Sequence, residues 1–398
     1  MIQGIDSISD DSKRAILRVD FNVPLDSEGQ ITDDTRIQKS LPTIEYLLGK
    51  KDLGIVLLAH LGRPKGSRVA KYSLKPVLEK LKQVLPKVNI LFCDDVTSVQ
   101  AKKQAKNLQP GEILFCENIR YYEEETSKDD NEREAFAKTI SELGDVYVDD
   151  AFGACHRKHA SIFDIAKFLP GYAGMLLKKE IEILESILKK PERPFVAIIG
   201  GSKVSSKIAV LKNLLNKVDT ILIGGAMAYT FQKARALEVG TSMVENDFLS
   251  EAFQIVDKAD YNQVEFKLPE DHIVASEFSE KGKIKTSPKL ISVGFMGMDI
   301  GPKTRDTYSK VIKNAKTVLW NGPMGVFEMD KFAKGTMAVA KALTKVKGTT
   351  VVGGGDSVYA IKKAGLEDKV THISTGGGAT LEFIEGKTLP GIAALEKE

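Results

Sequence analysis

The chain has 398 residues, of which 42% are hydrophobic and 28% are charged, and its formal net charge at pH 7 is +3. A chain of this length can form two or three domains, and this composition is that of a globular protein. The small net charge predicts no nucleic-acid partner. The apolar runs are far shorter than the roughly twenty residues that span a bilayer, so no membrane partner is expected either.

The three cysteines, Cys93, Cys116 and Cys155, show no paired spacing. Such a set argues against a disulfide framework or a zinc site and is typical of a reducing compartment. The segment from Met1 to Asp6 lacks the apolar core of a signal peptide. From these features we expect a soluble, cytoplasmic protein.

Short apolar runs recur along the chain and alternate with amphipathic stretches. In the first half the runs are residues 15–19, 55–59, 89–92, 113–116 and 146–148. In the second half they are residues 195–199, 220–223, 273–275, 317–320, 349–352 and 371–373. The amphipathic stretches include residues 71–85, 205–215, 330–343 and 357–364. Continuous rather than alternating hydrophobicity indicates strands that are covered on both faces, so the pattern predicts an α/β fold with doubly wound, Rossmann-like parallel sheets.

One amphipathic stretch, residues 175–188, has helical spacing and is followed by Pro191 and Pro194. We interpret it as a helix that joins two lobes. The predicted domains are an N-terminal lobe of residues 1–172, a connecting helix of residues 173–190 and a C-terminal lobe of residues 191–386, followed by a tail of residues 387–398. The polar and irregular residues 267–289 predict a β-ribbon.

The loops after the predicted strands differ in chemistry between the two halves. Eight of the eleven arginines precede Gly171, whereas the second half has glycine runs at residues 200–201, 224–225, 353–355 and 376–378. In open parallel sheets ligands bind beyond the carboxyl ends of the strands. Glycines there let backbone amides approach an anion, and arginine recognises phosphate or carboxylate at two points. The sequence therefore predicts two anion sites, one built from arginine and one from backbone.

Several of these features also have a purely structural explanation. A glycine pair after a strand can serve tight packing, although four such runs together favour phosphate binding. Lys203 and Lys207 are spaced to share one face of a starting helix, where an anion would offset their repulsion. Asp356 could cap a helix, or it could hold Mg²⁺ beside nucleotide phosphates.

The histidines His60, His156 and His159 lack carboxylates at ligand spacing, so hydrogen bonding to a substrate or a structural role is favoured over metal binding. Two nucleotide-binding motifs are missing. The Gly-Lys-Thr at residues 386–388 has Leu381 where a Walker A motif requires glycine, and no Gly-x-Gly-x-x-Gly follows a predicted strand. The latter absence weighs against a Rossmann dehydrogenase.

Seven motifs together identify a resemblance that covers essentially the whole chain. They are residues 18–24 (Arg-Val-Asp-Phe-Asn-Val-Pro), 60–64 (His-Leu-Gly-Arg-Pro), 150–157, 200–204, 321–328, 353–357 and 374–379. In this order and at these separations they resemble the phosphoglycerate kinase family.

The resemblance implies a two-lobed enzyme that reversibly transfers the acyl phosphate of 1,3-bisphosphoglycerate to ADP in glycolysis. It implies that the N-terminal lobe binds 3-phosphoglycerate or its bisphosphorylated form through Asp20, Phe21, Asn22, Arg36, His60, Leu61, Gly62, Arg63, Arg120 and Arg157. The implied nucleotide residues of the C-terminal lobe are Lys207, Gly297, Glu328, Gly354, Gly355, Asp356 and Ser357. Arg36, Lys203, Gly376 and Gly377 would meet the transferring phosphoryl group.

By the same resemblance, Asp356 would hold the Mg²⁺ that accompanies ADP or ATP, and the tail after Lys387 would return to the N-terminal lobe. A monomer is expected. Some positions depart from the family pattern: Asp149 replaces a common asparagine, Cys155 an alanine, Ser206 an aspartate and Ser357 a threonine. Of these, Asp149 would slightly lower the affinity for an anionic substrate.

Two other functions remain open from the residues themselves. One is a different two-lobed phosphotransferase that acts on another anionic metabolite, although the N-terminal arginines suit a small acid with both phosphate and carboxylate. The other is a binding protein that has lost turnover, against which the presence of Arg36, Lys203, Lys207 and Asp356 counts. No general base is required, because the nucleophile of the expected reaction is a carboxylate that is already ionised.

Overall fold

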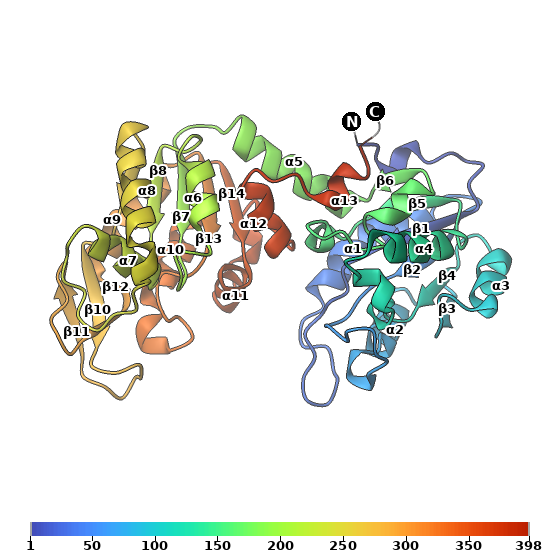
Figure 1. Ribbon diagram of the computed structural model, residues 1–398, viewed down its shortest axis with the longest axis horizontal. Helices are drawn as coiled ribbons and strands as arrows, with labels where there is room; N and C mark the ends of the chain where they lie inside the picture. Colours follow the sequence, from blue (N-terminus) through green and yellow to red (C-terminus); the bar gives the residue numbers. More distant parts are fainter. Residues whose placement is uncertain (1, 397–398) are drawn as a thin grey trace. The chain divides into compact units, whose positions relative to one another are not determined.

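The computed structural model describes residues 2–396, and the chain divides into two compact units. The N-terminal unit holds the residues up to Glu182 and the segment from Thr388 on, and the C-terminal unit holds Ile183–Lys387. The border between the units lies inside helix α5 (Met175–Lys189), which is labelled in Figure 1.

The N-terminal unit is built on a sheet of six parallel strands in the order β3-β4-β2-β1-β5-β6. The strands are β1 (Arg14–Arg18), β2 (Gly54–Leu58), β3 (Ile90–Cys93), β4 (Ile113–Cys116), β5 (Val146–Asp149) and β6 (Gly171–Ala173). Every residue of β2, β4 and β5 is buried. This explains the continuous apolar runs, because central parallel strands are covered on both faces.

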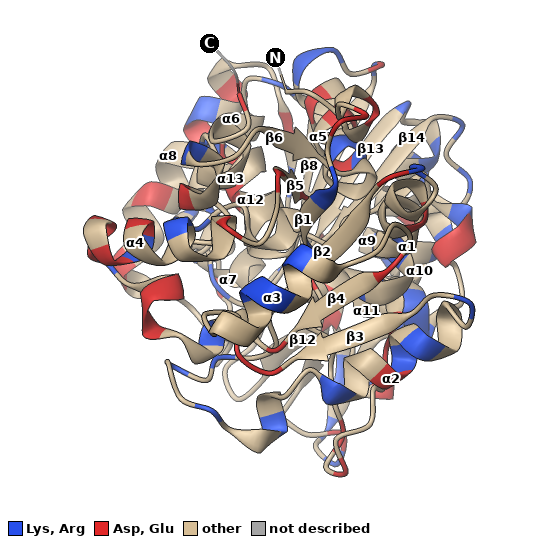
Figure 2. Ribbon diagram, turned by 90° about the vertical axis from the view of Figure 1, so that its right-hand side faces the viewer, with Lys and Arg blue, Asp and Glu red and all other residues tan. Residues whose placement is uncertain are grey.

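Several helices belong to the same unit. They are α1 (Thr35–Leu48), α2 (Lys75–Val84), α3 (Val99–Asn107), α4 (Asp130–Ser141) and the short α13 (Pro390–Ala393). One hydrophobic core joins α1 and α2 to the strands and includes Leu17, Ile37, Ile44, Leu47, Ile55, Leu57, Leu81 and Phe115. Burying one such side chain contributes about 1.5–3 kcal/mol, so the core fixes the strand ends firmly. In Figure 2 both signs of charge are mixed along α2 and α4, whereas α3 is mainly basic.

The two ends of the chain both belong to the N-terminal unit. Ile2 pairs antiparallel with Glu396, so the described ends lie side by side near β6 (Figure 1). The amide of Gly391 in α13 donates to the carbonyl of Cys155 at 2.9 Å. The last described residues therefore pack beside the loop that follows β5.

The C-terminal unit contains a second sheet of six parallel strands, in the order β15-β14-β13-β7-β8-β9. The strands are β7 (Phe195–Ile199), β8 (Thr220–Ile223), β9 (Glu265–Lys267), β13 (Thr317–Asn321), β14 (Thr349–Gly353) and β15 (His372–Ile373). Its helices are α6 (Ile208–Leu214), α7 (Met227–Ala234), α8 (Leu249–Tyr261), α9 (Pro302–Asn314), α10 (Lys334–Leu343), α11 (Gly355–Lys363) and α12 (Gly378–Ile384). Trp320 lies in the core of this unit and its indole N–H donates to the Gly322 carbonyl at 2.8 Å.

A smaller antiparallel sheet of three strands belongs to the same unit. It consists of β10 (Asp271–Ala275), β11 (Ile284–Pro288) and β12 (Met296–Ile300), with β10 in the centre. The predicted β-ribbon at residues 267–289 is thus confirmed. The apolar run at residues 273–275 was wrongly assigned to the βαβ repetition, because it pairs within this ribbon and not in the parallel sheet.

The α/β fold class with two parallel sheets is confirmed. Two edge strands, β6 and β9, were not predicted from the sequence; each has only three residues. Among residues 2–396, no helix is both long enough and apolar enough to cross a membrane.

Candidate functional site

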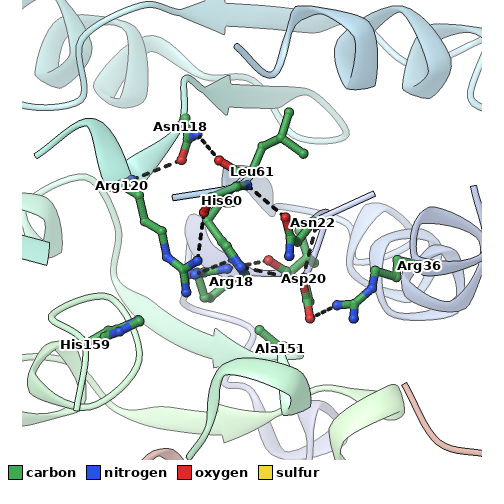
Figure 3. Close-up of polar contacts among 12 residues, drawn as sticks. Arg18, Asp20, Asn22, Arg36, His60, Leu61, Asn118, Arg120, Ala151 and His159 are labelled. Atoms are coloured by element: carbon green, nitrogen blue, oxygen red, sulfur yellow. Dashed lines mark hydrogen bonds and ion pairs between the residues drawn. The ribbon is translucent and has the colours of Figure 1, made fainter. Parts of the chain in front are cut away.

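The predicted arginine loops of the N-terminal unit converge at one edge of its sheet. They follow β1, β2, β4 and β5, which are neighbours in the order β4-β2-β1-β5. Because the four strands are parallel, their carboxyl ends meet at the same edge. Figure 3 shows that residues from these loops point toward one another.

Arg18, the last residue of β1, lies buried beneath the other residues of the site. It is fully buried, its Nε donates to the Ser161 hydroxyl at 2.9 Å, and one Nη donates to the Val19 carbonyl at 2.5 Å. Its other Nη contacts Nδ1 of His60 at 3.1 Å. Arginine cannot accept a hydrogen bond, so Nδ1 of His60 is the acceptor and the imidazole carries its proton on Nε2.

The charge of His60 is controlled by its surroundings. Burial lowers the pKa of His60 well below its ordinary value, and the nearby Arg120, Arg18 and Arg36 lower it further. Nε2 of His60 lies 3.9 Å from Oδ1 of Asp20. At neutral pH the ring is therefore an uncharged donor, and it is a poor proton acceptor.

Asp20 and Asn22 organise the loop after β1. Oδ2 of Asp20 forms an ion pair with Arg36, which lies in the first turn of α1. Oδ1 of Asp20 accepts the amide of Asn22 at 3.2 Å, and Oδ1 of Asn22 accepts the amide of Gly62 at 2.8 Å. These contacts join the loops after β1 and β2 (Figure 3).

Arg120 reaches the same edge from the segment after β4. Its Nη1 donates to the Gly62 carbonyl at 3.0 Å, whereas its buried Nε has no hydrogen-bond partner. Burial, with a contribution from Arg18, lowers the pKa of Arg120 to about 10. Arg120 thus carries its charge in a buried environment that disfavours the charge, and its Nε is available to donate a hydrogen bond to an anionic ligand.

Asn118 and Glu125 support the cluster. The side-chain amide of Asn118 donates to the carbonyl of Leu61 at 2.7 Å, and its oxygen accepts the backbone amide of Arg120 at 3.1 Å. Glu125 is fully buried and accepts the Ser161 hydroxyl at 2.6 Å. Its neighbours Glu123 and Glu124 are exposed, whereas Glu125 is enclosed beneath the arginines.

The other predicted substrate residues fall into two groups. Arg63 and Arg157 are exposed, although both lie within electrostatic reach of the cluster. Phe21 and Leu61 are buried members of the hydrophobic core, so these two residues can offer only their backbone to a ligand. Burial lowers the pKa of His159 to about 3, so this histidine is also uncharged at neutral pH.

Two of the residues that depart from the family pattern, Asp149 and Cys155, lie just behind the arginine cluster. Asp149 is buried, accepts the Ala151 amide at 2.9 Å and receives the Cys155 thiol at 3.4 Å. Burial raises the pKa of Asp149 to about 6. An aspartate is thus accommodated at this position by local hydrogen bonds.

The glycine runs of the C-terminal unit separate into two kinds. Gly200 and Gly225 pack against the backbone of neighbouring loops: a Cβ on Gly200 would clash with the Pro323 carbonyl oxygen, and the Gly225 amide donates to the Met324 carbonyl at 2.9 Å. A Cβ on Gly225 would lie 2.6 Å from the amide nitrogen of Gly201. Close packing therefore accounts for Gly200 and Gly225, whereas a Cβ on Gly201, at φ +119°, would meet nothing within 4 Å.

The remaining two runs are more open. A Cβ on Gly355 or Gly377 would meet nothing within 4 Å, and Gly354 and Gly377 have φ values of +88° and +52°. Positive φ is readily adopted only by glycine. These runs lead directly into α11 and α12, so their backbone remains available for an anion.

The two lysines after β7 do not share a helix face as predicted. Helix α6 begins at Ile208, so Lys203 lies in the preceding turns and Lys207 is the N-cap residue. Lys203 is exposed, whereas Lys207 is half-buried and its Nζ donates to Oδ1 of Asn321. The prediction failed because the turn after Gly201 uses residues that would otherwise form the first helical turns.

Asn321, at the end of β13, was in a recognised motif but received no role. It links Lys207 to the glycine loop, since its side-chain amide donates to the Gly353 carbonyl at 2.9 Å. Ser357 is buried and its oxygen accepts the Gly322 amide at 2.6 Å, so it secures the same loop from the other side.

Asp356 is exposed in the first turn of α11, and its charge acts on Lys207. A single open carboxylate beside a glycine loop fits Mg²⁺, which favours one or two carboxylates together with phosphate oxygens and water. Among residues 2–396, no group of three or more His, Cys, Asp or Glu side chains could hold a metal without a ligand's help.

The residues that would contact the adenine and ribose of a nucleotide, Gly297 and Glu328, lie elsewhere in this unit. Gly297 is in β12, where its amide donates to the Ser242 hydroxyl at 2.9 Å and its Cα faces the ring of Tyr229. Glu328 is exposed after the Gly325 turn. Of the supporting residues that were missed, Arg18 had the clearest signal, because a charged residue that ends an apolar strand requires a partner.

The chain is similar to known proteins over nearly its whole length. Residues 5–387 match the sequence profile of the phosphoglycerate kinase family. A phosphoglycerate kinase of Leptospira biflexa is 56% identical over 384 residues, which cover 96% of this chain and 95% of the relative. One from Pseudothermotoga lettingae is 51% identical over 387 residues, which cover 96% of each chain.

A solved structure of phosphoglycerate kinase from Coxiella burnetii superposes with a TM-score of 0.89 at 40% identity and covers 99% of both chains. The structure of the Pyrococcus horikoshii enzyme gives a TM-score of 0.85 at 32% identity, covering 99% of this chain and 98% of the other. With relatives this similar over nearly its whole length, the chain belongs to the phosphoglycerate kinase family.

Proposed function

We propose that this protein catalyses the reversible transfer of the acyl phosphate of 1,3-bisphosphoglycerate to Mg²⁺-bound ADP, which gives 3-phosphoglycerate and ATP. The observation that carries the proposal is the arginine cluster at the carboxyl edge of the N-terminal sheet. There Arg36 and Arg120 surround a neutral His60 above the buried Arg18. Together with family membership, this chemistry favours a small acid with both phosphate and carboxylate groups.

In the N-terminal unit, Arg63, Arg120 and Arg157 would hold the phosphate end of the substrate. The unpaired Nε of Arg120 supports this role, because a ligand oxygen would supply its missing acceptor. His60 would donate from Nε2, and Asn22 and Asp20 would keep the surrounding loops in place. Arg36, held by Asp20, would face the phosphoryl group that transfers.

The proposed reaction needs no catalytic base. The attacking carboxylate of 3-phosphoglycerate is already ionised at neutral pH, so catalysis depends on positioning and on neutralising oxygen charge. The low pKa of His60 and of His159 fits this requirement, because neither histidine would take up a proton.

In the C-terminal unit, the loops at Gly354–Gly355 and Gly376–Gly377 would surround the nucleotide phosphates, with Lys207 beside them. Lys203 would meet the transferring phosphoryl, Glu328 the ribose and Gly297 the adenine. Asp356 would hold the Mg²⁺, and Ser357 would fix the loop that carries it. When bound, this ion neutralises charge on the phosphate oxygens of the nucleotide.

We further propose that α5 connects the two lobes, that the enzyme works as a monomer and that it acts in the cytoplasm. These proposals extend the family assignment. The monomer would be tested by light scattering of the purified chain with and without both substrates.

A coupled assay tests the activity. The purified chain is given Mg²⁺, ATP and 3-phosphoglycerate, and product formation is compared with that from other small phosphorylated acids. We expect turnover with 3-phosphoglycerate to exceed that with the other acids. Turnover with a different acid only would favour another phosphotransferase, and binding of both substrates without turnover would favour a binding protein.

A further inference from the structure

Two of the three cysteines lie beside one another although they are far apart in the sequence. Cys93 ends β3 and Cys116 ends β4, and the two are paired in the parallel register of these strands. Neighbouring strands lie about 4.8 Å apart, and paired residues point to the same face. This spacing falls within the roughly 4.4–6.8 Å that separates the Cα atoms of disulfide-bonded cysteines. Both cysteines are free thiols.

The two sulfur atoms differ in reactivity. The side-chain contact with Cys116 lowers the pKa of Cys93, and the same contact together with burial raises the pKa of Cys116 well above its ordinary value. The Cys93 thiol donates to the Asp95 carbonyl at 3.3 Å. Cys93 is 3% exposed on the edge strand of the sheet, and Cys116 is completely covered. Because Cys93 lies on the edge strand and is the less covered of the two, we expect Cys93 to be the sulfur that reacts first.

The third cysteine offers a control within the same chain. Cys155 is buried, and its sulfur lies 3.4 Å from the Asp149 carboxylate and 3.5 Å from the Ala151 carbonyl. Burial and the neighbouring carboxylate raise the pKa of Cys155 well above its ordinary value. We therefore expect Cys155 to stay reduced under conditions in which Cys93 reacts.

We propose that Cys93 and Cys116 form a redox modification site, which a peroxide converts into an intramolecular disulfide. The Cys93 thiolate attacks one peroxide oxygen, the O–O bond breaks, and the leaving hydroxide takes up a proton to become water. The resulting sulfenic acid is attacked by the Cys116 sulfur; a S–S bond forms, the S–O bond breaks, and the hydroxyl leaves as water with the Cys116 proton. The two thiols lose two electrons in total, and one hydrogen peroxide becomes two waters.

The site is connected to the arginine cluster through β4. Glu117 follows Cys116 directly, and its amide donates to the Cys93 carbonyl at 2.8 Å. The next residue, Asn118, holds both the Leu61 carbonyl and the Arg120 amide. A disulfide would draw the ends of β3 and β4 together and displace this support of Arg120. Since parallel strands leave the Cβ atoms farther apart than a relaxed disulfide needs, the bond would be strained and readily reduced.

The consequence for substrate binding rests on the proposed function, whereas formation of the disulfide does not. The first experiment therefore measures the modification alone. The full chain is reduced, freed of reductant and treated with hydrogen peroxide, and its mass and its non-reduced peptides are measured. We expect the loss of two hydrogen masses and a Cys93–Cys116 linked peptide, both reversed by dithiothreitol.

Matched variants sharpen this experiment. Cys93→Ala and Cys116→Ala should each abolish the mass loss, and Cys155→Ala should retain it. Peptide mapping of the unaltered chain decides the question even if a variant does not fold. Disulfide-linked dimers, oxidation of Cys155 in place of the pair, or a sulfinic acid at Cys93 without a cross-link would overturn the proposal.

The second experiment measures 3-phosphoglycerate affinity by calorimetry on the reduced, oxidised and re-reduced chain, with Mg²⁺-ADP as the second ligand. Loss of one charged hydrogen bond from Arg120 would weaken 3-phosphoglycerate about tenfold, with nucleotide affinity unchanged. If the oxidised chain contains the disulfide and binds 3-phosphoglycerate as before, the connection to the arginine cluster is refuted. If the reduced chain does not bind 3-phosphoglycerate, the proposed function fails instead.

Discussion

Replacing Arg120 with alanine should separate ligand binding from stability. At neutral pH the folded protein holds the Arg120 charge although burial lowers its pKa from 12.5 to about 10. This difference corresponds to a cost of about 3 kcal/mol. Against this cost, the side chain donates one hydrogen bond, to the Gly62 carbonyl, and its Nε has no partner. Arg120→Ala should therefore lower the free energy of unfolding by less than about 1 kcal/mol, or even raise it.

The effect on the ligand should be large. A hydrogen bond to a charged group contributes about 1.5–3 kcal/mol, so the dissociation constant for 3-phosphoglycerate should rise about 10- to 150-fold. Titration calorimetry measures this constant, and urea unfolding of the free protein measures stability. Nucleotide affinity should remain that of the unaltered protein.

Arg14→Ala is the matched control. Arg14 begins β1, at the opposite end of the strand from the cluster, and its Nη2 pairs with the Asp145 carboxylate at 2.7 Å. We expect the reverse outcome there, with lower stability and unchanged binding of 3-phosphoglycerate. If Arg120→Ala were the more destabilising change and kept its affinity for 3-phosphoglycerate, the reasoning from the buried charge would be refuted.

Three further predictions follow from the site and its surroundings. Lys203→Ala should lower kcat roughly 10²- to 10³-fold and leave Mg²⁺-ADP affinity nearly unchanged, because it would act on charge that develops during transfer; a near-normal kcat in the coupled assay would exclude this role. Burial raises the pKa of Asp150 to about 8. The folded state thus keeps the proton, so the stabilisation that is fully present below about pH 4 is lost as the pH rises toward 8. In urea unfolding, the free energy of unfolding of Asp150→Asn should fall by about 1–3 kcal/mol less over this pH range than that of the unaltered protein. If the two proteins lost stability equally with rising pH, the prediction would be contradicted. Because the proposed substrates bind different units, the radius of gyration in solution scattering should be smaller with both substrates than with either one, and equal radii would count against substrate-driven closure.

The sequence was sufficient for the fold class and for the gathering of the arginine loops at one edge of the N-terminal sheet. Both depend on local patterns: apolar runs that mark buried strands, and polar residues that follow those runs. Strands such as β6 and β9 were missed because three residues at a sheet edge leave no pattern to detect. The neighbour of a strand also cannot be inferred from spacing, which is why Cys93 and Cys116 gave no sign of being paired.

The glycine runs show a second limit. Gly225 and Gly355 look alike in the sequence, since each belongs to a glycine run between a strand and a helix. In the fold, a neighbouring backbone fills the space beside Gly225, whereas the space beside Gly355 is open. The difference is determined by loops that come from other strands, so a local motif cannot distinguish packing from anion binding.

Buried carboxylates neutralise the arginine cluster only in part. Arg18 and Arg120 would repel one another at this depth, and Glu125 and Asp20 offset only part of that repulsion. Burial raises the pKa of Glu125, which shows that even this partner is ionised at some cost. Further carboxylates could pair with Arg120 in the free protein, but they would also compete with an anionic ligand for the same donors. The incomplete pairing of Arg120 is therefore better understood as part of ligand recognition than as a defect of packing.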